Sequence, residues 1–393
     1  MDKKKITIIA LVVVVYLFFT GISYALFSGG LLTSLSSNEA SVTSPVAQKT
    51  SDNQVLFDTA LPKTESCPLN GALYSKQQKK WWEQHRPLGV MIENHEDARP
   101  QSGLSFADVI YEAVAEGGIT RFLAVYYCQD AGIVGPVRSA RTYFLDWISE
   151  YGSNPLYAHV GGANTPGPAD ALSQIDEYGW QEYNDMNQFS LGFPTFWRDY
   201  DRLGHTAATE HTMYSTTTKL WDLAKSRELT NVDKDGASWD EKFITYAFKN
   251  DVSQSERPAS QAIHLEFWNG YGKYFIDWNY SPTENLYKRL NGSQIHQDKD
   301  TEKQLTAKNI VVLSMIENNA DDGYENNLHL SYQTKGTGKA FIFMDGKQIK
   351  GTWRKTGRTG RTLIFDSEGS SVKFNKGTIW FEILPTTGVI NVK

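Results

Sequence analysis

Residues 107–128 read ADVIYEAVAEGGITRFLAVYYC, two apolar runs on either side of a Glu-Gly-Gly turn. Side chains that favour strands fill both runs, and a short glycine-containing link is typical of a hairpin. The sequence therefore predicts two paired strands over Ala107–Ala115 and Ile119–Cys128. A helix is the alternative for the first run, because Ile110 and Val114 also fit helical spacing.

Strands and helices alternate around this hairpin. PLGVMIE (Pro87–Glu93) and Pro155–Val160 read as further strands, and the apolar spacing of Thr216–Arg227 predicts a helix. Ser139 stands where it would cap another helix that continues through Tyr151. This alternation is typical of a mixed α/β domain.

The chain changes character after Arg257 and Pro258, where short strand-like runs are separated by glycine turns. We expect an α+β protein with a mixed α/β domain over residues 65–256 and a β-rich domain over residues 257–393. A basic run between two of these strands, Arg354–Arg361, is expected to be a solvated hairpin tip. The strands expected in the second domain are Ile263–Trp268, Tyr274–Tyr280, Ile310–Ile316, Lys339–Met344, Thr362–Asp366 and Thr378–Leu384.

The N-terminus carries one long apolar run, Ile6–Phe27, with three lysines directly before it. As a helix these residues would be about 33 Å long, enough to cross a bilayer core of about 30 Å. The lysines place residues 1–27 as a cytoplasmic tip and signal anchor, with the rest of the chain outside. A cleaved signal peptide is the alternative, because Ser23 and Ala25 form a small-residue cleavage site. Residues 28–64, rich in Ser, Thr and Asn, are expected to be a flexible stalk.

The net charge of the chain argues against a nucleic-acid partner. The 393 residues carry −6, and the three lysines and one aspartate at the N-terminus contribute +2, which leaves −8 on the remainder. Binding to a phosphate backbone needs a basic face. The two cysteines, Cys67 and Cys128, are expected to form a disulfide in an exported protein, with two buried free thiols as the alternative.

Polar residues gather where the first domain's predicted strands end, which is where a scaffold usually holds binding groups. With Ser139 as a helix cap, Arg138 would precede the first turn and Arg141 would lie within it, an arrangement that favours an anion. Structural ion pairs from these two arginines to nearby acids are the alternative. The residues expected to bind a ligand are Asn94, Arg99, Gly117, Gly118, Arg121, Arg138, Ser139 and Arg141.

Four residues in the same region are of the types that carry out acid–base chemistry: Glu93, Glu116, His159 and His211. The nucleophile-elbow pattern Gly-x-Ser-x-Gly is absent from the sequence. The sequence also has no paired-histidine zinc signature, so neither a metal nor a cofactor is expected.

Several runs resemble a known family, the YerB-like lipoproteins, which carry a domain of unknown function (DUF3048) in an N-terminal and a C-terminal part. The resemblance implies a bacterial envelope protein with two paired domains and implies no reaction. The chain departs from the family by lacking the cysteine that carries a lipid. It also reads EHTMY (residues 210–214) where a Pro-His-Asn-Leu-Tyr-like run is typical, which leaves His211 as the matching position. The matching runs are MIENHEDARPQSGLSFADVIYEAVAEGGITRFLAVY (91–126), GPVRSAR (135–141), YAHVGG (157–162), GTWRKTG (351–357) and GTIWFEILP (377–385).

These observations lead to two functional hypotheses. The first is a membrane-anchored, extracytoplasmic envelope protein that grips an anionic wall component or a partner protein near Arg121, Arg138 and Arg141. The second is an envelope enzyme, a hydrolase or transferase, that acts on phosphate-linked or glycan material. Convergence of the acidic, basic and histidine side chains on one pocket would support either hypothesis.

Overall fold

The computed structural model describes residues 48–49, 54–325 and 328–393. The expected anchor over Ile6–Phe27 lies outside these ranges. Within them, no helix is both long enough and apolar enough to cross a bilayer. The last residues of the expected stalk, from residue 54 onward, contact the folded part. The Val55 N–H, for example, donates to Asp130 Oδ2 at 2.7 Å.

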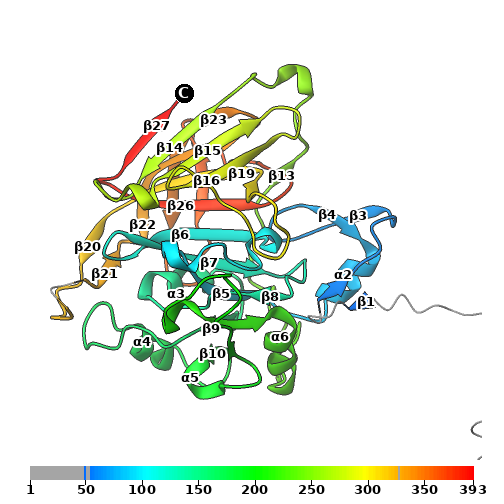
Figure 1. Cartoon of the computed structure of the whole chain (residues 1–393). Helices are drawn as coiled ribbons and strands as arrows, with labels where there is room; N and C mark the ends of the chain where they lie inside the picture. The colour runs from blue at the N-terminus through cyan, green and yellow to red at the C-terminus, as the bar shows by residue number, and fades with distance from the viewer. Residues whose placement is uncertain (1–47, 50–53, 326–327) are drawn as a thin grey trace, which may run out of the picture. The chain divides into compact units, whose positions relative to one another are not determined.

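A ten-stranded mixed sheet forms the centre of the protein (Figure 1). The hairpin expected from the sequence is present as strands β6 and β7, so the helical alternative for the first run is wrong. In spatial order the strands are β10 (Asp185–Asn187), β9 (Leu156–His159), β5 (Leu88–Glu93), β7 (Ile119–Tyr126), β6 (Val109–Glu116), β26 (Ile379–Pro385), β19 (Asn309–Met315), β22 (Gly336–Met344), β23 (Lys347–Lys355) and β24 (Leu363–Asp366).

The sheet continues from the N-terminal half of the chain into the C-terminal half. Strands β6 and β26 pair in parallel, with Val109 opposite Ile379 and Glu112 opposite Glu382. Tyr111 stacks on the ring of Phe381 at a centroid distance of 4.7 Å. The domain boundary expected near residue 257 stays a prediction, but hydrogen bonding and core packing cross between the two halves at this pair of strands.

A second sheet, antiparallel throughout, lies beside the C-terminal strands of the central sheet (Figure 1). Its inward side chains alternate with solvated ones along β15, as expected for a sheet with one covered face. Its strands are β17 (Gln294–Ile295), β16 (Leu286–Asn291), β15 (Ile276–Ser281), β14 (Ala262–Glu266) and β27 (Val389–Val392), and β18 (Thr306–Ala307) pairs with β16.

Small sheets and short helices complete the fold, with α3 to α6 gathered around the N-terminal strands (Figure 1). The small sheets are β1 (Gln48–Lys49) with β2 (Val55–Leu56), β3 (Lys63–Ser66) with β4 (Leu73–Ser75), β11 (Trp197–Arg198) with β12 (Met213–Thr216) and β8 (Ile133–Val134), β13 (Phe248–Lys249) with β25 (Phe374–Asn375), and β20 (Glu317–Asn319) with β21 (Leu330–Tyr332). The α-helices are α2 (Lys76–Trp82), α3 (Thr142–Ile148), α4 (Ala171–Glu177), α5 (Gln188–Leu191) and α6 (Thr217–Ser226). Single 3-10 turns are η1 (Glu96–Ala98), η2 (Leu104–Phe106), η3 (Thr209–His211), η4 (Gln254–Glu256) and η5 (Gly272–Tyr274).

Local capping explains where the longest helix begins. The Thr216 side chain accepts a hydrogen bond from the Lys219 N–H at 3.1 Å, which satisfies one of the free donors at the start of α6. The prediction that Ser139 caps a helix is wrong. Helix α3 begins only at Thr142, has Arg141 at its N-cap position without a side-chain cap, and spans seven residues. The helix start that was expected at Ser139 is therefore absent.

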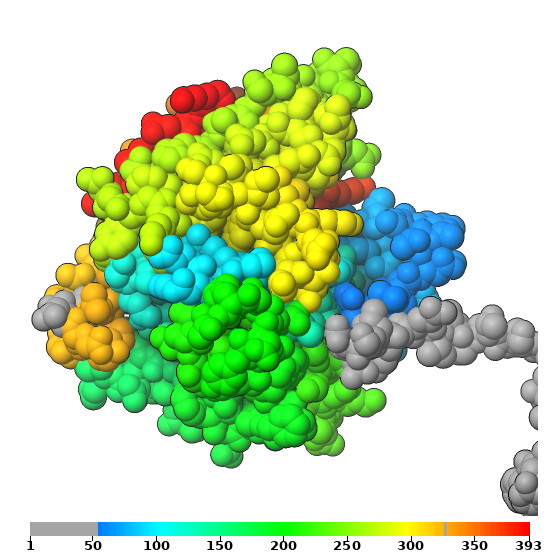
Figure 2. Space-filling model, viewed as in Figure 1, coloured from blue at the N-terminus to red at the C-terminus, as the bar shows by residue number. Residues whose placement is uncertain are grey.

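Loops of the C-terminal half also lie on the N-terminal half. The Lys299 N–H donates to the Gln101 carbonyl oxygen at 2.7 Å, and the Ser105 N–H donates to Asp298 at 3.0 Å. Figure 2 shows this contact on the surface, where the yellow C-terminal segment rests directly on the cyan N-terminal segment. The two halves therefore share a core and a surface seam.

Candidate functional site

A cavity of about 380 Å³ opens where the arginine-rich segment GPVRSAR meets the connection between β20 and β21. We call it the arginine cavity. Both halves of the chain contribute to its wall, since one side comes from residues 116–164 and the other from residues 324–325 and 328–329. The residues that line it are Glu116, Arg138, Ser139, Arg141, Gly162, Ala163, Asn164, Tyr324, Glu325, Leu328 and His329.

Glu116 holds two of the expected arginines together at the edge of the cavity. Its carboxylate lies 3.0 Å from Arg121 Nη2 and also pairs with Arg141 Nη2. Burial alone would raise the pKa of Glu116, but the attraction of Arg121 and Arg141 outweighs it and lowers the pKa to about 2. Glu116 is therefore ionised at neutral pH and has no proton to donate as a general acid.

Arg138 has a guanidinium group that the protein satisfies only in part. Its Nε lies 3.3 Å from Glu93 Oε1, and 27% of its side chain is exposed. Within the described residues neither terminal nitrogen of Arg138 makes a hydrogen bond, and its Nε has no well-aligned acceptor. Arg141 also keeps an unpartnered Nε although it is only 5% exposed. Unused guanidinium donors thus remain at the cavity.

Glu93 connects the arginine cavity to a histidine pair outside it. One carboxylate oxygen faces Arg138, and the other accepts a hydrogen bond from His211 Nδ1 at 2.8 Å. The hydrogen bond with Glu93 raises the pKa of His211 above its usual value, in spite of partial burial. The ring of His211 stacks on that of His95, with centroids 4.8 Å apart and planes 12° apart. Of the four expected acid–base residues, only Glu93 and His211 touch each other.

His159 is placed elsewhere, fully buried on β9. Its Nε2 lies 2.6 Å from Asp185 Oδ1 and its Nδ1 lies 2.6 Å from the Gly161 carbonyl oxygen. Both ring nitrogens therefore have a close oxygen neighbour, and the imidazole is held from two sides. This geometry fixes the Gly161 turn beside the cavity and leaves His159 without access to a ligand.

Asn94 and Arg99 belong to a different region. The side-chain amide of Asn94 is fully buried and donates to Thr120 at 2.8 Å and to Asn291 at 2.9 Å. Arg99 lines a second cavity of about 310 Å³, where its guanidinium donates to Asn94 and to the Lys273 carbonyl oxygen. The structure therefore does not bring these two residues to the arginine cavity.

The two glycines that were expected to bind a ligand form the turn between β6 and β7. Gly117 and Gly118 have φ angles of +55° and +76°, which L side chains rarely adopt. A Cβ on Gly118 would come within 2.3 Å of the Tyr271 ring, whereas one on Gly117 would meet no atom within 4 Å. Ser139 lines the cavity, and its carbonyl oxygen accepts from Arg121 Nη1 at 2.8 Å.

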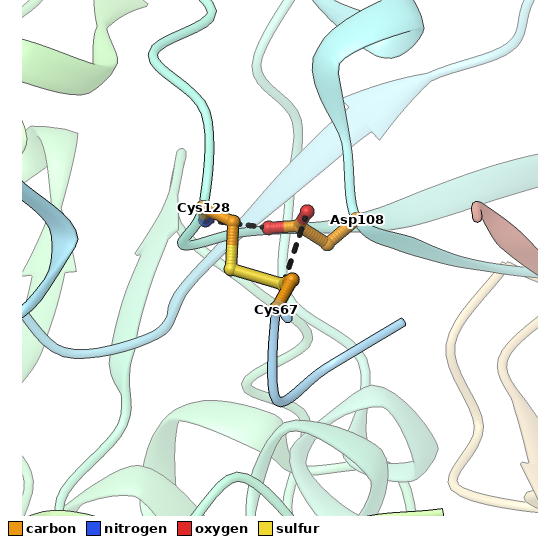
Figure 3. Close-up of side chains that lie close together, drawn as sticks. All are labelled: Cys67, Asp108 and Cys128. Atoms are coloured by element: carbon orange, nitrogen blue, oxygen red, sulfur yellow. Dashed lines mark hydrogen bonds between the residues drawn. A yellow bond between two sulfur atoms is a disulfide. The ribbon is translucent and has the colours of Figure 1, made fainter. Parts of the chain in front are cut away.

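Cys67 and Cys128 form the expected disulfide, with their Cα atoms 6.0 Å apart (Figure 3). The carboxylate of Asp108 lies beside it and accepts N–H groups of Tyr127 and Cys128, both at 2.8 Å. Burial raises the pKa of Asp108 to about 7. Both sulfur atoms are used by the disulfide, so this cluster of Cys67, Asp108 and Cys128 cannot hold a metal ion.

Comparison with known proteins gives the family. Two family models match, the N-terminal domain of a protein of unknown function (DUF3048) over residues 72–230 and the corresponding C-terminal domain over residues 263–381. The chain belongs to the DUF3048 family. It is 29% identical over 331 residues to the "Putative lipoprotein YerB" of Bacillus subtilis, a match that covers 84% of this chain and 88% of that protein. The crystal structure of YerB from Bacillus subtilis superposes with a TM-score of 0.67 at 25% identity, covering 84% of this chain and all of the other.

Membership of the DUF3048 family agrees with the resemblance expected from the sequence. The N-terminal model covers the expected acid–base residues and the expected ligand-binding residues alike, and it also covers His95. Sequence reasoning missed the cavity residues from the second half, Tyr324 and His329, whose rings stack at a centroid distance of 4.0 Å. No spacing in the sequence could have found them, since about 200 residues separate them from Glu116.

Proposed function

We propose that this DUF3048 protein is a membrane-anchored, extracytoplasmic envelope protein that binds an anionic envelope component in the arginine cavity. The observation that carries the proposal is the guanidinium end of Arg138, which lines the cavity and has no hydrogen-bond partner among the described residues. A guanidinium presents a planar fork that matches the oxygens of a phosphate or carboxylate.

The free guanidinium donors of the cavity support an anion as its ligand. Arg121, Arg138 and Arg141 pair with the carboxylates of Glu93 and Glu116, and Glu325 also lines the cavity, so the charges of the wall balance. The attraction for an anion comes from the donors of Arg138 and Arg141 that have no hydrogen-bond partner among the described residues. The site is partly enclosed, so water screens these groups less than it would at an open surface.

The size and lining of the cavity favour a small phosphate-bearing unit. A volume of about 380 Å³ lies toward the lower end of ligand pockets, which range from roughly 300 to 1,000 Å³. The hydroxyl of Ser139 and the amide of Asn164 supply neutral hydrogen-bonding groups, and the Tyr324 ring supplies an apolar face. A glycerol-phosphate or sugar-phosphate unit of a wall polymer combines these features.

The location outside the cytoplasm rests on the sequence and on the relative. Three lysines precede an apolar run of membrane-spanning length, which favours export of everything that follows. The relative from Bacillus subtilis is named a "Putative lipoprotein", and lipoproteins are tethered to a membrane by a lipid. A disulfide also persists best in an oxidising compartment.

Titration calorimetry with the full chain tests the proposal, with glycerol-phosphate oligomers and inorganic phosphate as probes. Arg138→Gln is expected to weaken binding by about 10- to 100-fold, because a charge-assisted hydrogen bond contributes about 1.5–3 kcal/mol. Arg354→Gln is the matched control, since Arg354 is an exposed arginine on β23 that does not line the cavity. Equal affinity of the wild type and Arg138→Gln, or no binding of either probe, refutes the proposal.

An enzyme is the second candidate, and the Glu93–His211 pair is the observation that favours it. A histidine held by a carboxylate and adjacent to a binding cavity is a common acid–base arrangement. Release of phosphate-containing fragments from the oligomers during prolonged incubation, abolished by His211→Gln, would support a hydrolase. Intact oligomers in the same incubation support binding alone.

A further inference from the structure

We propose that His95, Asp97 and His211 form a binding site for a first-row divalent cation such as Zn²⁺. One potential ligand atom from each of the three lies within 4.8 Å of the other two. Neither the family descriptions nor the proposed anion binding assigns a role to this cluster, and it lies outside the lining of the arginine cavity.

The donor set matches the chemistry of such cations. Imidazole nitrogens suit zinc and its neighbours in the first transition row, and two histidines with one carboxylate are a recurrent ligand set that leaves positions open for water. Cations that prefer oxygen ligands alone, such as Ca²⁺, fit less well. The cluster therefore favours zinc or a similar metal over calcium or magnesium.

The hydrogen bond from His211 to Glu93 orients the His211 ring for metal binding. His211 Nδ1 donates to Glu93 Oε2 at 2.8 Å, which leaves the lone pair of Nε2 free to bind a metal. Metal-binding histidines almost always make such a bond from their other nitrogen, because it fixes the tautomer and the ring orientation. Only 7% of the His211 side chain is exposed, so the ring is also held by packing.

The other two ligands come from a short surface turn. His95 precedes η1 and Asp97 lies in it, with His95 Nδ1 at 3.6 Å from Asp97 Oδ2. Their side chains are 27% and 63% exposed, so a cation can reach them from solvent. His95 Nδ1 accepts a hydrogen bond from the Asp97 N–H at 3.2 Å, so His95 offers its Nε2 to a metal. Tetrahedral coordination at about 2.0–2.1 Å places donors about 3.4 Å apart, so metal binding requires the side chains of His95 and Asp97 to rotate toward His211.

The charges around the cluster also favour a cation. Carboxylates of Glu93, Asp97 and Glu210 face the histidine pair, and Arg138 is the positive group that interacts with His211. Arg138 pairs with one carboxylate oxygen of Glu93 and His211 with the other, so the carboxylate separates the guanidinium from the metal site and weakens the repulsion between them. Three carboxylates against one guanidinium leave a net negative environment around the two imidazole rings.

Metal binding can be measured directly on the full chain, purified without a histidine tag and stripped with a chelator. One equivalent of Co²⁺ is expected to give visible d–d absorption of a low-coordinate site, and Zn²⁺ is expected to displace it. His95→Ala and His211→Ala should abolish the absorption. Glu93→Gln should keep one site per chain but weaken Zn²⁺ binding by about 10- to 100-fold, as for other residues that orient a metal ligand.

His205→Ala is the matched control, since His205 is an exposed histidine whose Nδ1 faces only the Thr206 carbonyl oxygen. It should bind Co²⁺ as the wild type does. His95 is partly exposed, so the loss of binding in His95→Ala cannot be attributed to unfolding if the circular dichroism is unchanged. Absence of saturable Co²⁺ binding, or binding that survives in His95→Ala, overturns the site. Phosphate binding by Arg138 is a separate readout, so either proposal can fail alone.

Discussion

A buried charge cluster at the junction of the two halves yields a sharp prediction. Arg289 and the carboxyl groups of Glu112 and Glu382 are all fully buried. The guanidinium pairs with Glu112, lies 2.8 Å from Glu382 Oε1 and packs against the rings of Trp278 and Trp380. Burial, and then repulsion from Glu112, raise the pKa of Glu382 well above its usual value. The raised pKa favours the neutral form of Glu382, so we expect Glu382 to contribute less than Glu112 to balancing the charge of the arginine.

The two glutamates should consequently respond very differently to the same substitution. Glu112→Gln leaves the buried Arg289 without its counter-charge, and breaking such a pair from one side costs about 3–5 kcal/mol. Glu382→Gln replaces a carboxyl group that favours its neutral form by a neutral group of the same shape. The amide oxygen that this substitution introduces would still accept from Arg289 and from the Trp278 N–H, which donates to Glu382 at 2.8 Å. The cost of Glu382→Gln should be below about 1 kcal/mol, as for most substitutions that break no interaction.

Urea unfolding followed by tryptophan fluorescence provides the assay, because Trp278 and Trp380 flank the cluster. Glu112→Gln is expected to lower the free energy of unfolding by several kcal/mol more than Glu382→Gln at pH 7. Equal losses for the two variants, or a larger loss for Glu382→Gln, would show that the proton does not reside on Glu382 and would refute this reasoning.

The N-terminal half of the chain supports three more predictions. Replacing Cys67 and Cys128 by Ala should lower the free energy of unfolding by about 4 kcal/mol in the chain-entropy model, because the disulfide spans 61 residues, and urea denaturation of the oxidised wild type is the comparison. The pKa of Glu116 is lowered in the folded state, so its contribution to the free energy of unfolding is present above about pH 4.5 and is lost as the pH falls toward 2. Glu116→Gln should therefore lower the free energy of unfolding by up to about 3 kcal/mol at pH 7, and the melting temperature of this variant should change less with pH across this acid range. Gly117→Ala should lower the free energy of unfolding by about 1–2 kcal/mol because of its left-handed backbone, and Gly118→Ala should lower it further because its Cβ would meet the Tyr271 ring. Equal melting temperatures of the two variants would contradict this order.

The fold could be predicted well wherever a single run of side chains determines an element. The runs at Pro87–Glu93, Ile310–Ile316 and Thr378–Leu384 are strongly apolar, and each becomes a strand of the central sheet within one or two residues of the expected bounds. Buried strands need apolar residues on both faces, so they stand out in any sequence. Strand β23 was missed because its residues Lys347–Lys355 include three lysines and an arginine.

The basic run Arg354–Arg361 shows why charge alone misleads. It was expected to be a solvated tip, but Lys355 and Arg361 are buried and both pair with Glu150 of the N-terminal half. The expectation for Arg361 is therefore wrong, and the reason is a partner more than 200 residues away. A long-range pair of this kind leaves no local pattern. The Glu93–His211 contact and the second wall of the arginine cavity were hidden for the same reason.

The seam between β6 and β26 makes the two family domains interdependent. If residues 263–393 were removed, the backbone N–H and C=O groups of β6 that now face β26 would lie bare along an apolar strand, and the reverse cut would leave β26 in the same condition. Unpaired apolar edges recruit other strands and drive aggregation. The regions matched by the family's N- and C-terminal models are therefore joined in one hydrogen-bonded sheet, and we expect either region, expressed alone, to expose an unpaired apolar strand edge.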